Sequence, residues 1–118
     1  MSNAETTVLG FMRRLEAGDF RTLRSLLKDD LSFKGPFDSF DEPGFYLMAL
    51  QKLHPVIARI DVKKMFVDGD DVCVLYEMVT NTPVGTAFIA EWHHLEGDKI
   101  AAITAIFDAR PFAPMFAQ

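Results

Sequence analysis

Glu91, His93 and Asp108 are titratable side chains embedded in the apolar, strand-like C-terminal third of the sequence. Carboxyl and imidazole groups are costly in such surroundings unless they are paired or form a site. Glu91 and His93 are two residues apart, so in a strand they share a face and lie about 7 Å apart. At that separation Glu91 could donate a proton, or hold His93 in one tautomer for base catalysis. The structural alternative is an exposed or paired glutamate beside a surface histidine.

Asp108 follows the apolar stretch 101–107 and is expected to end the last strand. There it could abstract a proton from a bound carbon acid. Strict alternation places Asp108 on the face opposite Phe107, so if Phe107 lines a pocket, Asp108 points away unless a bulge intervenes. The structural alternative is a strand-end carboxylate that pairs with Arg110.

The composition predicts one folded domain over residues 5–118, because 118 residues with 49% apolar content can bury a core. Residues 1–4 include a Ser-Asn-Ala run that resembles the remnant of a cleaved tag. A net charge of −5 with scattered Lys and Arg argues against nucleic-acid binding. The single cysteine excludes an intrachain disulfide, and no long apolar run predicts a membrane span. With no secretion signal at the N-terminus, the expected location is cytoplasmic.

No cofactor or metal is expected from the sequence motifs. No His, Asp or Glu set has metal-ligand spacing, and no glycine-rich phosphate loop or Ser-His-Asp arrangement is present. His93 and His94 are adjacent and therefore point to opposite faces of a strand, so they cannot both bind one metal.

The hydrophobic pattern predicts helices first and long strands afterwards. A first helix is expected over residues 5–17, capped by Gly18, and Asp19 is expected to begin a short second helix that carries residues 20–27. This order indicates an α+β fold with an antiparallel sheet. The remaining predicted elements are a short strand at 31–34, a helix at 43–53 and long strands at 56–67, 71–81, 84–95 and 99–110.

The chain resembles the nuclear-transport-factor-2-like superfamily, and within it the SnoaL-like branch. The resemblance rests on Leu-Glu-Ala-Gly-Asp-Phe at 15–20 and on Gly-Asp-Lys-Ile at 97–100 leading to Ile-Phe-Asp at 106–108. It implies a cone-shaped, cystatin-like fold, in which a curved antiparallel sheet wraps around N-terminal helices and leaves an apolar pocket.

The same resemblance frames the function, because the family includes ketosteroid isomerases, polyketide cyclases, dehydratases, epoxide hydrolases and noncatalytic binders. Laid against ketosteroid isomerase, the phenol donor falls on Phe11 and the general base on Gly35, so neither group is present. The third group, a protonated acid, falls near Glu91. Isomerase chemistry of that type is therefore not expected, whereas Asp108 resembles the carboxylate base of SnoaL-like cyclases.

A small hydrophobic ligand is favoured by eleven Phe with only two Tyr, which offer ring surface with few polar groups. Filling of the core is the structural alternative. Phe45 is a further candidate beside the expected pocket, which is lined by Phe11, Leu15, Phe33, Phe37, Phe40, Tyr46, Ile89 and Phe107.

The last strands are apolar on both faces, and a second apolar face must also be buried, so a homodimer through the sheet face is predicted. Two functions remain open at this point. The chain is either a cofactor-independent isomerase, cyclase or lyase that acts on a small apolar carbonyl compound, or a noncatalytic ligand-binding or dimerisation domain.

Overall fold

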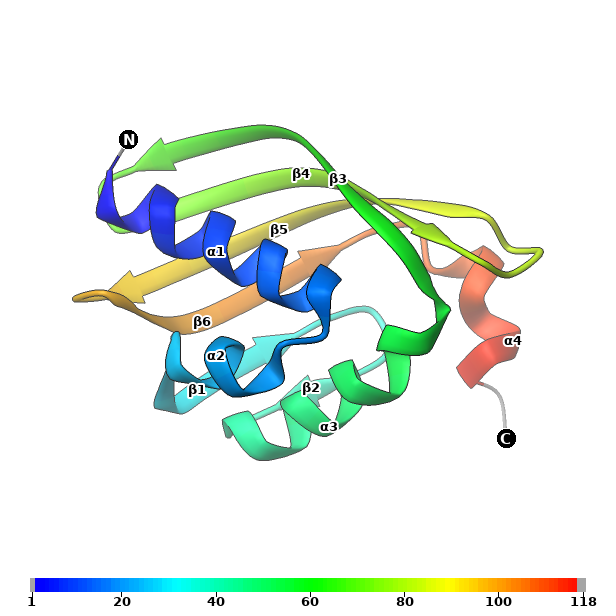
Figure 1. Cartoon of the computed structure of the whole chain (residues 1–118), viewed down its shortest axis with the longest axis horizontal. Coiled ribbons are helices and arrows are strands. Elements are labelled where there is room, and N and C mark those ends of the chain that lie inside the picture. The colour runs from blue at the N-terminus through cyan, green and yellow to red at the C-terminus, as the bar shows by residue number, and fades with distance from the viewer. Residues whose placement is uncertain (1, 117–118) are drawn as a thin grey trace.

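A computed structural model describes residues 2–116 of the chain. Three helices, α1 (Asn3–Ala17), α2 (Phe20–Ser25) and α3 (Pro43–Leu53), pack on one face of a curved six-stranded sheet (Figure 1). The core lies between these two layers. This arrangement confirms the α+β fold class expected from the sequence.

The sheet has the strand order β2-β1-β6-β5-β4-β3. One neighbouring pair differs from the expected antiparallel pattern, because β1 runs parallel to β6 and places Phe33 beside Ile103. The other pairs are antiparallel. The strands are β1 (Leu27–Lys34), β2 (Ser39–Phe40), β3 (Ile57–Asp68), β4 (Asp71–Thr80), β5 (Thr86–Glu96) and β6 (Lys99–Ile106).

Helix α1 is capped at both ends, and its C-terminal cap is the Gly18 that the sequence predicts. The Ser2 side chain accepts a hydrogen bond from the Glu5 amide at 3.1 Å, and Gly18 ends the helix with a φ of 75°. The helix starts at Asn3 rather than at residue 5, and the origin of residues 1–4 stays a prediction. The helix buries Ala4, Val8, Phe11, Met12 and Leu15.

The predicted boundaries were wrong in three places where tertiary pairing decides the structure. Leu27 is not helical but opens β1, because it pairs with Ile100 of β6. Between the predicted strand at 31–34 and the predicted helix at 43–53, the structure has a further strand, β2, which pairs with the end of β1. The last strand, predicted to reach residue 110, ends at Ile106. Three short helices complete the chain: η1 (His54–Val56), η2 (Arg110–Phe112) and α4 (Ala113–Phe116).

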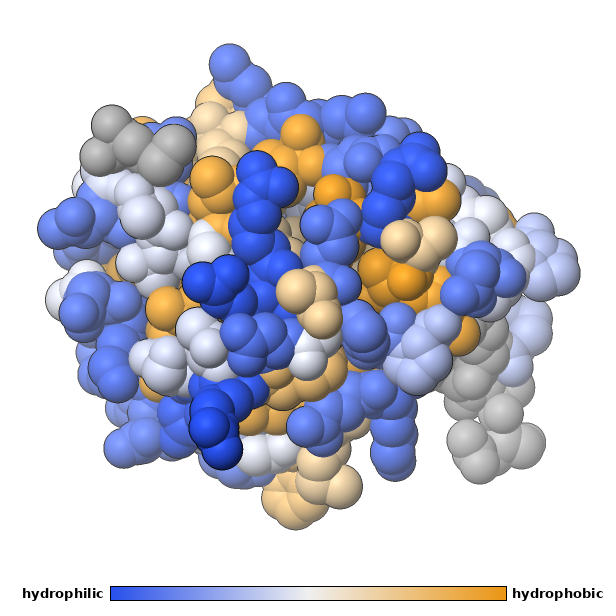
Figure 2. All heavy atoms as spheres, viewed as in Figure 1, coloured by the Kyte–Doolittle hydropathy of each residue, from blue (hydrophilic) through white to orange (hydrophobic). Residues whose placement is uncertain are grey.

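Burial alternates along the central strands, as expected for a sheet with helices on one face. In β5 every second residue from Ala87 to Leu95 is buried, while Phe88 and Trp92 are exposed on the other face. The helical face of the molecule is covered largely by hydrophilic residues, with hydrophobic atoms showing in patches between them (Figure 2). No helix within residues 2–116 is long and apolar enough to cross a bilayer.

Candidate functional site

The buried polar groups of the core gather on β5. Glu91 is 5% exposed and His93 is fully buried, and both face the helices. Glu91 lies opposite Val74 of β4 and Ala105 of β6. Because both of these cross-strand neighbours are apolar, the polar partners of Glu91 are not the residues directly opposite it.

Tyr76 and His93 supply those partners. The Tyr76 hydroxyl donates to Oε2 of Glu91 at 2.9 Å, and Nε2 of His93 lies 2.9 Å from Oε1 of the same carboxyl. Tyr76 is two residues beyond Val74, so it reaches Glu91 diagonally across the β4–β5 pair. The expected interaction between Glu91 and His93 is therefore direct.

The unpaired nitrogen of His93 indicates where its proton lies. Nδ1 is buried without a hydrogen-bond partner among the described residues, and the ring packs edge-on against Phe11 with 5.2 Å between centroids. A buried N–H without an acceptor is rarer than a lone pair without a donor. We therefore assign the proton to Nε2, which donates to Glu91, so that the carboxyl accepts two hydrogen bonds.

The charge of Glu91 acts on both tyrosines of the chain. Tyr46, from α3, is 3% exposed and Tyr76 is 2% exposed. Burial raises the pKa of each phenol well above its usual 10.0, and the charge of Glu91 raises both pKa values further. Both hydroxyls therefore stay protonated near neutral pH and are available as hydrogen-bond donors.

Asp108 lies outside this buried cluster. It follows the end of β6 by two residues and is exposed, and its carboxylate forms an ion pair with Arg110 at 2.8 Å. The backbone amide of Arg110 also donates to it at 3.1 Å. The structure thus brings Glu91 and His93 together, and it places Asp108 in the pairing that the sequence offered as an alternative to a catalytic role.

The Arg110 contact gives Asp108 a distinctive titration. Side-chain and then backbone hydrogen bonds from Arg110 lower the pKa of Asp108 from 3.8 to about 2. The contribution of the Asp108 carboxylate to the stability of the fold is therefore complete above pH 3.8 and is lost as the pH falls through about 2. Carboxyl-carbon NMR should show this low midpoint, and Arg110→Gln should return it toward 3.8. Arg59→Gln, which removes a similar exposed pair with Asp61, should leave it unchanged.

The residues expected to line a pocket form two groups. Phe11, Leu15, Tyr46 and Ile89 are buried in the core. The partly buried group consists of aromatic rings that pack on the core: Phe33, Phe37, Phe40 and Phe107. Phe45 is 64% exposed and does not line the interior, because it lies on the outer face of α3.

The aromatic rings form two separate groups, within which each ring contacts another. Phe33 stacks on Tyr46 with 4.6 Å between centroids, and Phe40 lies 6.1 Å from Tyr46. Phe37 contacts Phe107 at 6.3 Å. These rings lie over the core.

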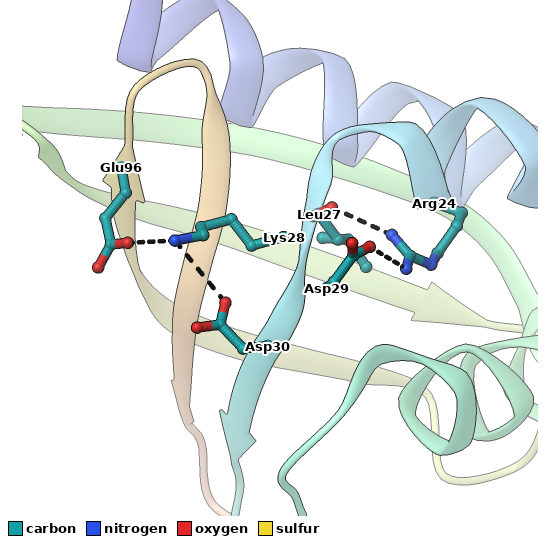
Figure 3. A network of polar contacts seen from close by, with 6 residues as sticks. All are labelled: Arg24, Leu27, Lys28, Asp29, Asp30 and Glu96. Carbon is teal, nitrogen blue, oxygen red and sulfur yellow. Dashed lines mark hydrogen bonds and ion pairs between the residues drawn. The ribbon is translucent and has the colours of Figure 1, made fainter.

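Two hollows on the described surface lie away from Glu91. One is lined by side chains of α1 and β3, and the other by Lys28, Asp29, Asp30 and Lys99. At the second hollow Lys28 pairs with both Glu96 and Asp30, and Arg24 pairs with Asp29 at 2.7 Å (Figure 3). The charged side chains drawn in Figure 3 are therefore already paired with one another. Within residues 2–116 no group of three His, Cys, Asp or Glu could hold a metal ion.

Sequence reasoning missed the role of Tyr76. The alternating run Val72, Val74, Tyr76 and Met78 shows which face the side chain takes. The pairing with Glu91 depends on the register between β4 and β5, for which the sequence has no local signal.

Comparisons with solved structures place the fold in a known class. The chain is similar to a nuclear-transport-factor-2-like protein of unknown function from Cytophaga hutchinsonii, with 27% identity, a TM-score of 0.81 and coverage of 97% of this chain and 95% of that one. It also shares its fold with an LEH-like epoxide hydrolase from M. tuberculosis, at 17% identity, a TM-score of 0.79 and coverage of 95% and 87%. A de novo designed protein with a curved β-sheet matches at 21% identity and a TM-score of 0.82, over 93% and 90% of the two chains.

The SnoaL-like domain model matches residues 8–103, so the chain belongs to the SnoaL-like domain family. Among curated proteins, none matches the chain in sequence. The resemblance seen in the sequence is therefore confirmed for family and fold.

Proposed function

We propose that the chain binds a small apolar carbonyl compound inside the cone and moves protons on it, with Glu91 as the acid–base group. The observation that carries the proposal is the carboxyl of Glu91, which is 5% exposed and held by Tyr76 and His93 at 2.9 Å each. Burying a carboxylate costs several kcal/mol. Such costly buried groups concentrate at functional sites.

The geometry supports proton abstraction next to a carbonyl group. Each oxygen of Glu91 accepts one hydrogen bond and keeps a second lone pair. The carboxylate takes a proton from the carbon beside the carbonyl, and the electrons of that C–H bond move onto the carbonyl oxygen as an enolate forms. Return of the proton to the same carbon gives exchange, and return to another carbon gives an isomer. No oxidant or reductant is needed.

Tyr76 and His93 hold the base in place. Two directional hydrogen bonds from β4 and β5 fix the carboxyl plane, so little reorganisation accompanies proton transfer. A ligand reaches Glu91 by displacing the partly buried rings above the core. The exposed pair of Asp108 and Arg110 has no part in this proposal.

Hydrogen–deuterium exchange at a carbon acid tests the chemistry without knowledge of the natural substrate. Cyclohexanone in D₂O should lose its α-hydrogens faster with the protein than in buffer, as followed by proton NMR. Glu91→Gln keeps the shape of the side chain but cannot accept the proton, so the catalysed rate should fall at least about 100-fold. Glu96→Gln is the matched control, because it changes an exposed glutamate of the same strand.

The competing function is a noncatalytic ligand-binding domain. It is favoured by the position of the two hollows, neither of which borders Glu91. Exchange at the buffer rate with the unmodified protein, or equal rates for the protein and Glu91→Gln, would support this alternative and remove the acid–base proposal.

We also infer that two copies of the chain associate through the outer face of the sheet. Four large apolar side chains there are more than half exposed, namely Phe66, Phe88, Trp92 and Ile106. Register places Phe66 and Trp92 on either side of Cys73 in one row across three strands. Monomers rarely expose apolar patches of this extent. The cytoplasmic location stays a prediction.

A further inference from the structure

Strand β3 leaves one margin of the sheet without a neighbouring strand. It is the last strand in the order β2-β1-β6-β5-β4-β3 and lies at the edge of the sheet (Figure 1). An edge strand presents amide and carbonyl groups that can pair with a further strand. The other edge strand, β2, has only two residues, whereas β3 has twelve, so β3 offers the longer template.

The hairpin turn between β3 and β4 determines which backbone groups point toward the free edge. Asp68 and Asp71 pair across a two-residue turn, so these two residues exchange backbone hydrogen bonds with each other. Hydrogen-bonded and non-hydrogen-bonded pairs alternate along an antiparallel ladder. The amides and carbonyls of Val67 and Met65 therefore point away from β4, toward the free edge.

Helix α1 closes the start of this edge and leaves the rest open. The Ile60 amide donates a hydrogen bond to Oε2 of Glu16 at 2.7 Å. Val62 and Val67 are 36% and 41% exposed, although both pair with residues on the helical face of the sheet. A hollow between α1 and β3, lined in part by Leu9, borders Val62. The open edge of β3 is thus the segment 62–67.

Cations accompany the open edge. Lys63 and Lys64 lie within it, and Arg13 lines the hollow beside it. Lys63 pairs with Glu77 at 3.1 Å, whereas Lys64 and Arg13 have no ion-pair partner within residues 2–116. Two cations are therefore left to attract an acidic partner, on a chain whose net charge is −5.

We propose that the open edge of β3 binds an extended, acidic segment of another protein, which adds to the six-stranded sheet as a seventh strand. Backbone hydrogen bonds to Met65 and Val67 hold the segment, and its alternate side chains provide selectivity. Apolar side chains on one face of the segment pack toward the hollow beside Leu9. Acidic side chains on its other face lie beside Lys64, because Lys64 and Met65 point to opposite faces of the sheet. This binding is independent of the proposed acid–base chemistry.

A second copy of the chain fits this edge less well than an acidic segment does. The midpoint of the open edge lies between Lys64 and Met65, so two-fold pairing of two β3 strands brings Lys63 and Lys64 of both copies together. Like charges so placed on neighbouring strands are destabilising. Association through the outer face of the sheet leaves the backbone edge of β3 free.

Two synthetic peptides, blocked at both ends, test the proposal. One has three Val-Asp repeats and the other has three Val-Lys repeats. Titration with the acidic peptide, followed by amide NMR of the labelled protein, should shift the signals of Met65 and Val67. It should also slow their exchange with solvent, because both amides gain an acceptor. The acidic peptide should bind at least about 10-fold more tightly than the basic one.

A proline at the open edge tests the backbone pairing. Val67→Pro removes an amide proton that points away from β4, so the ladder with β4 is kept and the thermal stability should change little. Affinity for the acidic peptide should fall about 10-fold, because the added strand loses a hydrogen bond and meets the proline ring.

Reversal of one charge tests the selectivity. Lys64→Glu should weaken binding of the acidic peptide about 5-fold and strengthen binding of the basic peptide by a similar factor. Lys34→Glu is the matched control, because it makes the same change at an exposed lysine of β1. That control should leave both affinities unchanged.

Other results overturn the proposal. Shifts at Phe88 and Trp92 in place of the open edge would show that the peptide covers the outer face of the sheet. If Val67→Pro turns a dimeric chain into monomers, a second copy occupies the edge. Equal affinities for the two peptides, or no shift at millimolar acidic peptide, would remove the acidic partner.

Discussion

Titration of the folded protein to high pH is expected to leave both tyrosines protonated well beyond the pH at which an exposed phenol ionises. Burial, followed by the charge of Glu91, raises the pKa of Tyr46 and of Tyr76 well above 10.0. The folded state therefore holds these protons more tightly than the unfolded chain. The resulting stability is complete below pH 10.0 and is lost as the pH rises through the pKa values of the folded state.

Two spectroscopic signals check this expectation. The ultraviolet absorbance of tyrosinate should appear together with the loss of the circular dichroism of the fold, because ionisation requires the phenols to leave the core. A gradual rise of tyrosinate centred near pH 10.0, with unchanged circular dichroism, would contradict the burial of these residues.

A matched pair of variants isolates the part played by Glu91. Glu91→Gln removes the negative charge, so tyrosinate should appear at a lower pH than in the unmodified protein. Asp71→Asn removes an acid that bonds to Trp92 at the other surface of the sheet. In the Asp71→Asn control, tyrosinate should appear at the same pH as in the unmodified protein.

The sequence predicted well those features that depend on local periodicity and caps. The alternation along β5 correctly places Glu91 and His93 on one face, and Gly18 takes the left-handed conformation expected at the end of α1. These features follow from the side-chain direction of a strand and from the conformational freedom of glycine. Both are properties of a few consecutive residues.

Features set by distant pairing escaped prediction. Leu27 looked helical because it continues the apolar spacing of α2, yet pairing with Ile100 of β6 places it in a strand. Tyr76 and Glu91 are 15 positions apart in the sequence, and only the pairing of β4 with β5 brings the hydroxyl within 2.9 Å of the carboxyl.

The fold by itself does not decide between catalysis and binding. An epoxide hydrolase and a designed protein share the architecture with this chain at similar TM-scores, so the architecture is compatible with very different roles. The argument for chemistry therefore rests on Glu91 and its partners.

Association of two copies gives the second large expected effect. The unmodified chain should sediment as a dimer, and Phe88→Lys should convert it to a monomer. Phe88 is 57% exposed on the outer face of β5. In a symmetric dimer each substitution enters the interface twice, once from each copy. Burying two lysine charges in an apolar contact should weaken dimerisation far more than the roughly 2 kcal/mol typical of one important contact residue.

Phe45→Lys is the matched control for this experiment. Phe45 is 64% exposed, so the two substitutions make the same chemical change at similar exposure, but Phe45 lies on α3, on the opposite side of the sheet. Sedimentation equilibrium should therefore report a dimer for Phe45→Lys and a monomer for Phe88→Lys. A monomeric unmodified chain would contradict association through either surface. If Phe45→Lys alone dissociates the dimer, the interface lies on α3 and not on the sheet, because a new lysine weakens association only where its charge is buried in the contact.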